Sequence, residues 1–212
     1  MAATPCSSLD AADSRLLLEI AASAIESRLE SATGGAPPDL GTLPISLTRY
    51  AACFVSLQTR AGLRGCCGML EASRPLAIDA WHNARASAFA DRRFPPLQVH
   101  EWPIVSRLEI SVLSALEPMV TASEAQLQDA LAPHVDGVVL SWGGQRATFL
   151  PKVWDQIGDT REFLQHLKMK AGWSAQFWAR DMVVLRYSTT EASIEWPAGR
   201  RRESPRSKPG LP

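Results

Sequence analysis

The residues with the clearest chemical potential form the octet LRGCCGML at positions 63–70. Side chains of an extended strand alternate between two faces, so Arg64, Cys66 and Gly68 are predicted to share one face. A neighbouring guanidinium favours the thiolate of cysteine, which is the form that attacks electrophiles. Gly65 and Gly68 leave room for another backbone or a ligand. The octet therefore predicts a site with Cys66 as candidate nucleophile and Arg64, Gly65 and Gly68 as candidate substrate-binding residues.

Each of these side chains also has a structural interpretation. A free cysteine such as Cys66 is often a small buried apolar group. Arg64 can lower the thiol pKa, hold a substrate carboxylate or phosphate with its planar fork, or form a salt bridge to a neighbouring strand. Glu109 lies on the polar face of a predicted strand, where it is either that salt-bridge partner or a general acid/base. The sequence alone leaves these alternatives open.

A second charged cluster, Asp91-Arg92-Arg93-Phe94, follows a predicted helix. Such residues commonly tie a loop down through hydrogen bonds to the backbone. If the site binds an anion, Asp91 and Arg93 are further substrate-binding candidates, with Arg93 as the donor. Lys170, at the end of another predicted helix, is explained by the helix dipole, with a substrate role as the alternative. None of the four histidines occurs in a signature that pairs it with Cys66, so a papain-like hydrolase is not supported.

The cysteine pattern predicts neither a metal site nor a cofactor. The four cysteines at positions 6, 53, 66 and 67 form no CxxC pair and no zinc-type spacing. Cys66 and Cys67 point to opposite faces of a strand, so a disulfide between them would distort the backbone. Reduced thiols indicate a cytoplasmic protein, and no apolar run is long enough to suggest a membrane span.

The charge balance gives no general reason to bind nucleic acid, because 22 basic and 22 acidic side chains cancel. The exception is the basic stretch at 197–212, which could contact nucleic acid or an acidic partner, although such a run is more often a solvated terminus. Its proline and glycine content predicts disorder. Residues 7–196 are predicted to form the folded part.

The hydrophobic pattern predicts helices and hairpins that interleave without a regular strand-helix-strand alternation. Helices are expected at 7–30, 75–90, 123–132 and 159–170. Strands are expected at 49–58, 63–70, 104–114, 137–142 and 146–150, with 182–188 as the last main strand. This order favours an α+β fold with mostly antiparallel sheet over a doubly wound fold.

Three blocks of the sequence together resemble the AMMECR family. They are LRGCCGML, PLAIDAWHNARASAFADRRFPPL from position 75, and DGVVLSWGGQRATFLPKVWDQIG from position 136 with FLQHLKMKAG from position 163. The family hallmark is an LRGC-[aliphatic]-G segment, and here Cys67 stands in place of the aliphatic residue. The resemblance runs from about Leu43 to about Tyr187 and implies two packed α+β lobes.

The resemblance also implies a functional setting. The bacterial branch of the family is protein A of the AmmeMemoRadiSam system, which implies a MEMO-like protein and a radical SAM enzyme as partners. An enzyme or enzyme component that uses Cys66 in a cleft is the first hypothesis. The alternatives are a non-catalytic binding module for a peptide, RNA or another anionic ligand, and a scaffold subunit.

Overall fold

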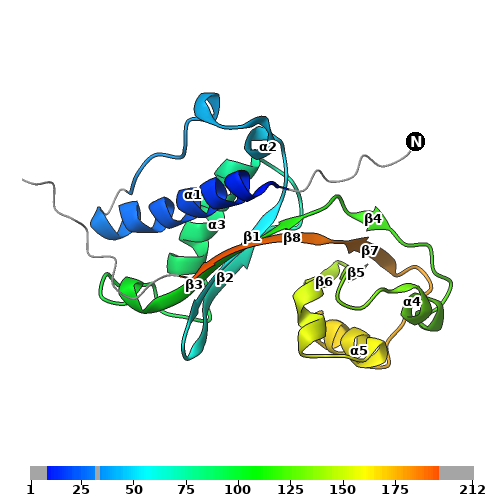
Figure 1. The fold of residues 1–212 in the computed structure, drawn as a ribbon. Coiled ribbons are helices and arrows are strands. Elements are labelled where there is room, and N and C mark those ends of the chain that lie inside the picture. Colours follow the sequence, from blue (N-terminus) through cyan, green and yellow to red (C-terminus); the bar gives the residue numbers. More distant parts are fainter. Residues whose placement is uncertain (1–8, 32–33, 196–212) are drawn as a thin grey trace, which may run out of the picture.

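The computed structural model describes residues 9–31 and 34–195, which form two lobes built on two four-stranded antiparallel sheets (Figure 1). The first sheet has the order β2-β1-β3-β8 and the second the order β4-β7-β5-β6. The strands are β1 (Cys53–Thr59), β2 (Gly62–Gly68), β3 (Val105–Leu113), β4 (Glu117–Pro118), β5 (Gly137–Trp142), β6 (Gln145–Phe149), β7 (Val183–Tyr187) and β8 (Thr189–Glu195). The predicted α+β class is confirmed.

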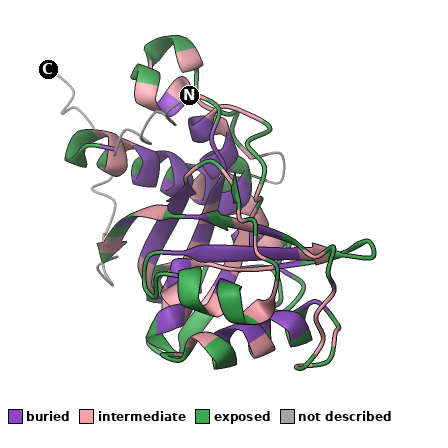
Figure 2. Ribbon diagram, turned by 90° about the vertical axis from the view of Figure 1, so that its right-hand side faces the viewer, coloured by how far each residue is buried: buried purple, intermediate pink, exposed green. Residues whose placement is uncertain are grey.

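In the first lobe, helices α1 (Ala11–Glu30) and α3 (Leu76–Phe89) pack on one face of the first sheet, and the short α2 (Ile45–Thr48) packs beside them. The side chain of Asp10 caps α1 by accepting from the Asp13 N–H, as expected for an N-cap aspartate. The apolar sides of both helices meet alternate residues of β1 and β3, such as Val55 and Ile110, in one buried core. Figure 2 shows buried positions, in purple, on the strands of the sheet and on the helices that cover it.

In the second lobe, α5 (Thr160–Lys170) and α4 (Glu124–Ala130) pack with β5, β6 and β7 around Trp154 and Phe163. The rings of these two residues stack with centroids 3.7 Å apart. Trp154 lies in the 3-10 segment η3 (Pro151–Asp155); two other such segments are η1 (Leu40–Thr42) and η2 (Trp102–Ile104). Gly143 and Gly144 both have positive φ at the β5–β6 turn, which explains the predicted glycine turn of this hairpin.

Two strand connections join the lobes. The chain passes from β3 to β4 and returns from β7 to β8, and the two passages run side by side and are hydrogen-bonded to each other. There the Ser114 N–H donates to the Ser188 carbonyl oxygen at 2.9 Å, and the Ser188 N–H donates to the Ser114 hydroxyl at 3.0 Å. A small apolar cluster that includes Leu113, Val139 and Tyr187 packs beside these two passages. The relative position of the lobes is therefore defined by backbone bonds and packing together.

Strand β8 corrects the prediction that 182–188 is the last main strand. Residues 189–195 form a full edge strand of the first sheet, in which Ile110 of β3 pairs with Ala192. The segment TTEASIE has few large apolar residues, because only one of its faces meets the core. Residues 7, 8 and 196 and the predicted disordered segment 197–212 lie outside the described residues. Within the described ranges, no helix is both long and apolar enough to cross a membrane.

Candidate functional site

Cys66 lies in the edge strand β2, with its side chain on the face of the first sheet that is turned away from α1 and α3. The register places Cys66 beside Ser56 of β1, Ser56 beside Glu109 of β3, and Glu109 beside Ser193 of β8. Paired residues of neighbouring antiparallel strands point to the same face. Lys152 of the second lobe binds Glu109, so this polar row faces the second lobe. The predicted hairpin and strand alternation place Cys66 on the face between the lobes.

Helix α3 holds β2 from the opposite face through a contact that only glycine permits. A Cβ atom on Gly65 would lie 2.1 Å from the Ser87 carbonyl oxygen. The buried Ser87 hydroxyl lies 2.6 Å from the Val55 carbonyl oxygen and accepts the Cys67 N–H at 2.8 Å. It thereby bridges the β1–β2 pair directly beside Cys66. The close approach of backbone predicted at Gly65 is present, and it is made by a helix.

The backbone of Cys66 is held on its outer side by the Asp91–Arg93 pair. The Cys66 N–H donates to Asp91 Oδ2 at 2.9 Å, and Arg93 Nη2 donates to the Cys66 carbonyl oxygen at 3.1 Å. The same guanidinium binds Asp91 Oδ2 at 2.7 Å. The hydrogen bond from Arg93 lowers the pKa of Asp91 well below its usual range. Asp91 and Arg93 thus satisfy the free edge of β2 and fix the position of the cysteine.

Arg64 has a structural partner that differs from the one predicted. Its Nε and Nη2 donate to the two carboxylate oxygens of Glu101, both at 3.0 Å, and Nη2 also donates to the Pro95 carbonyl oxygen. This two-point geometry is typical of arginine with carboxylate. Arg64 therefore fastens the 95–101 loop to β2. The cation that lowers the pKa of Cys66 most is Arg93.

Glu109 is not the partner of Arg64, so that part of the prediction is wrong. Its side chain is 3% exposed and accepts from Lys152 Nζ at 2.7 Å, with Arg107 Nη2 at 3.3 Å. A buried carboxylate needs such compensation, which a lysine of the other lobe and an arginine of the same strand supply. The Glu109–Lys152 pair consequently links the first sheet to η3 of the second lobe.

The ionisation of Cys66 depends on burial and on the charged groups around it. Burial raises the pKa of the Cys66 thiol most, the charge of Arg93 lowers it, the charges of Cys67 and Asp91 raise it, and the charge of Lys170 lowers it least. Lys170 ends α5 and donates from Nζ to the Thr148 carbonyl oxygen at 2.9 Å. Burial and the charge of Arg93 lower the pKa of Lys170, and the charge of Cys66 raises it. The thiol is accordingly protonated at neutral pH, and its pKa is lowered by the charges of two cations from different lobes.

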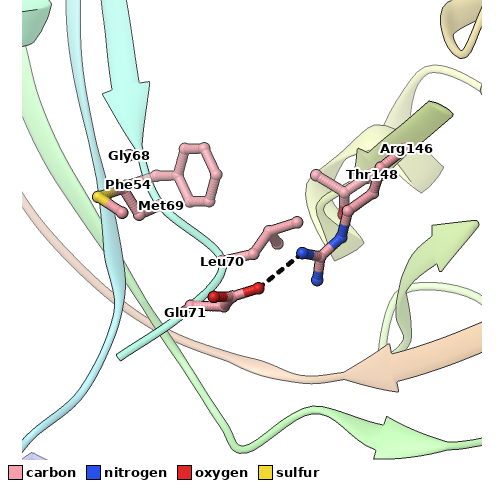
Figure 3. A pocket seen from close by; sticks show the side chains of 7 residues that line it. All are labelled: Phe54, Gly68, Met69, Leu70, Glu71, Arg146 and Thr148. Carbon is pink, nitrogen blue, oxygen red and sulfur yellow. Dashed lines mark hydrogen bonds and ion pairs between the residues drawn. The ribbon is translucent and has the colours of Figure 1, made fainter. Parts of the chain in front are cut away.

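A pocket of about 430 Å³ opens between the lobes next to this site (Figure 3). Gly68 lines it two residues beyond Cys66 on the same face, and Thr148 lines it from β6. A Cβ atom at Gly68 would lie 2.4 Å from Cγ of Phe54. The Phe54 ring therefore occupies space that any side chain at position 68 would need. Figure 3 shows Glu71 and Arg146 bridging the two sides, with Arg146 Nη1 donating to Glu71 Oε1 at 2.8 Å.

In the ranges that the structure describes, the other cysteines and His82 lie away from the face that carries Cys66. The described residues contain no group of three or more His, Cys, Asp or Glu side chains that could hold a metal ion. Cys67 pairs with Val55 and points to the helix-covered face, and Cys53 is buried there. His82 is exposed on α3, where its ring meets the edge of Trp81.

Sequence reasoning missed two residues of the site and did not connect a third with Cys66. Ser87 and Glu101 carry no local motif, and each meets β2 only through the fold. Lys170 was considered, but its position at a helix end is fully explained by the dipole, and nothing local indicates its approach to Cys66. Gly65 is the one local signal of the helix contact. A glycine within a strand indicates that another backbone or a ligand comes close, but it does not indicate which segment.

Comparison with known proteins supports the same architecture. A protein of Thermofilum pendens is 35% identical over 181 residues, covering 80% of this chain and 84% of that protein. A protein of Methanothermobacter thermautotrophicus is 37% identical over 162 residues, covering 76% and 82%. The crystal structure of the uncharacterized protein PH0010 from Pyrococcus horikoshii superposes with a TM-score of 0.80 at 28% identity, covering 87% and 92% of the two chains. The AMMECR1 family profile matches residues 18–192, so the chain belongs to the AMMECR1 family.

Proposed function

We propose that this chain is an enzyme or enzyme component that acts on a small molecule bound between its lobes, with the Cys66 thiol as the group that attacks it. The observation that carries the proposal is the positioning of Cys66. Its N–H and its carbonyl oxygen are held by Asp91 and Arg93, and its side chain faces the second lobe. A reacting group must be held within a fraction of an ångström, and such hydrogen bonds supply that precision.

The charges around the thiol define how it would react. Only the thiolate attacks electrophiles, and the cations of Arg93 and Lys170 favour that form. Burial opposes them and raises the pKa of Cys66, so the thiolate is a minority form at neutral pH. Turnover is therefore expected to increase as the pH rises above neutrality.

A second candidate function is binding without chemistry. The raised pKa of Cys66 favours it, because a protonated thiol is a weak nucleophile and an ordinary contact for a ligand. The same face between the lobes would then hold an anionic ligand unchanged. The two candidates make opposite predictions for a Cys66→Ser substitution.

We expect Cys66→Ser and Cys66→Ala to abolish turnover, because a hydroxyl at this place is far less ionised than a thiol. The purified chain and both variants would be incubated with a deproteinised cell extract, and the consumption of small molecules followed by mass spectrometry at pH 7 and pH 9. Cys67→Ser is the matched control, since Cys67 points to the helix-covered face and should leave turnover unchanged.

Compounds consumed by the wild type and the control, but by neither Cys66 variant, would support the thiol enzyme. Consumption by Cys66→Ser at the wild-type rate would contradict it. A compound that is retained by the wild type and by Cys66→Ser, and recovered unchanged from both, would replace the proposal with the binding function.

A further inference from the structure

Lys170 differs from the other cations on the face between the lobes, because its charge is not matched by a carboxylate. Arg93 pairs with Asp91, Lys152 with Glu109, and Arg146 with Glu71. In the described part of the chain, the hydrogen bond of Lys170 Nζ goes to the neutral Thr148 carbonyl oxygen, and the ammonium lies 5.1 Å from the centroid of the Phe149 ring. The Cys66 end of the face therefore carries one uncompensated positive charge.

Cys66 itself does not compensate this charge. Burial keeps its thiol protonated at neutral pH, so the sulfur is neutral when no ligand is bound. Lys170 is exposed, so its ammonium group can be reached by a ligand that approaches from solvent. An anionic group of a ligand would supply the missing charge at this point.

On the side of the first lobe, the pocket is lined by apolar residues and by Glu71, whose carboxylate is paired with Arg146. Phe54 and Leu70 line it, and both also pack against the apolar cluster at the junction of the lobes. Thr148 connects the two features, because its carbonyl oxygen binds Lys170 while the same residue lines the pocket. Thr148 thus places the Lys170 ammonium group at the side of the pocket.

On this basis we infer that the ligand of this site is a small amphipathic anion, whose carboxylate or phosphate lies beside Lys170 and whose apolar portion enters the pocket lined by Phe54 and Leu70. The inference rests on the proposed function, to which it adds the substrate class. An anion of this kind would bind with its charged end beside the Cys66 sulfur. Charge and apolar length should both contribute to its affinity.

The test is protection of Cys66 from alkylation by iodoacetamide at pH 8.5, followed by peptide mass spectrometry in a Cys67→Ala background. Hexanoate, acetate, hexyl phosphate, hexylamine and 1-hexanol would be titrated as protecting probes. Hexanoate is expected to protect at a concentration on the order of tenfold lower than acetate, since part of its longer chain is removed from water. Hexylamine and 1-hexanol should protect at least about tenfold less well than hexanoate, because they lack the negative charge. The affinity of hexyl phosphate relative to that of hexanoate shows whether the site prefers a phosphate or a carboxylate.

Two variants assign the effect to its residues. Lys170→Gln should remove the preference of the anions over 1-hexanol, whereas Arg161→Gln, which removes a positive charge from the exposed start of the same helix, should retain it. Leu70→Ser should reduce the advantage of hexanoate over acetate while keeping the preference for anions. Circular dichroism and a thermal melt would show that each variant is folded.

Equal protection by hexanoate, hexylamine and 1-hexanol, or no protection by any probe, would overturn the inference. These outcomes are distinguishable from failure of the proposed function. A chain whose Cys66-dependent turnover persists without anion-selective protection retains the proposed function and loses the inference. A chain that binds hexanoate through Lys170 but consumes no compound retains the inference as a binding site.

Discussion

Gly65→Ala is expected to destabilise the chain by about 3 kcal/mol, because overpacking against a backbone cannot be relieved by a side-chain rotation. The added Cβ would lie 2.1 Å from the Ser87 carbonyl oxygen and 3.0 Å from its carbonyl carbon. Either α3 must move away from β2, or β2 must bend outward. Both movements separate the Ser87 hydroxyl from the Cys67 N–H and disturb the position of Cys66. Urea denaturation followed by circular dichroism measures the loss.

Gly158→Ala is the matched control. A Cβ at Gly158 has no neighbour within 4 Å, and its backbone conformation is one that alanine adopts. This substitution should change the free energy of unfolding by less than about 1 kcal/mol in either direction. A Gly65→Ala variant as stable as Gly158→Ala would contradict the close contact between α3 and β2.

Glu124→Gln is expected to have an effect of similar size in the second lobe, about 3–5 kcal/mol, because it leaves a buried charge without a partner. Lys168 is 1% exposed, and its Nζ donates to both carboxylate oxygens of Glu124, at 2.8 and 2.9 Å. This pair fastens α4 to the last turn of α5, which also carries Lys170. Thermal and urea unfolding of the variant would measure the loss.

Glu162→Gln provides the comparison for this prediction. Glu162 lies in the first turn of α5, is exposed, and is 3.7 Å from His166. Removing an exposed charge should cost less than about 1 kcal/mol. If Glu124→Gln were no more destabilising than Glu162→Gln, the buried pair would not be what holds α4 to α5.

Local pattern was sufficient to place Cys66. The alternation of a strand assigns Cys66 and Gly68 to one face, and the turn at 59–62 assigns β2 to a hairpin with β1. These features depend on residues that are close in sequence, so they can be predicted from the local sequence pattern. Gly65 likewise indicated a close approach, which Ser87 of α3 makes.

The partners of the charged residues could not be predicted in the same way. Arg64 binds Glu101, Glu109 binds Lys152, and the charge of Lys170 acts on Cys66 from a different lobe. Each pairing joins segments far apart in sequence, and its geometry depends on how the sheets and lobes pack. A sequence contains several carboxylates that could each pair with a given arginine. The sequence therefore predicts that the partner is a carboxylate, but not which one.

The Cys66 thiol lies in a partly buried site between the lobes, where burial raises its pKa and the charges of Arg93 and Lys170 lower it. The most direct measurement is the rate of Cys66 alkylation by iodoacetamide as a function of pH, in a Cys67→Ala background. The rate should rise through a midpoint above the ordinary thiol pKa, because burial raises the pKa of Cys66 more than the two cations lower it. Lys170→Gln should move this midpoint to higher pH, and Arg161→Gln should leave it in place. A midpoint at or below the ordinary thiol pKa, or one that Lys170→Gln does not move, would contradict the account.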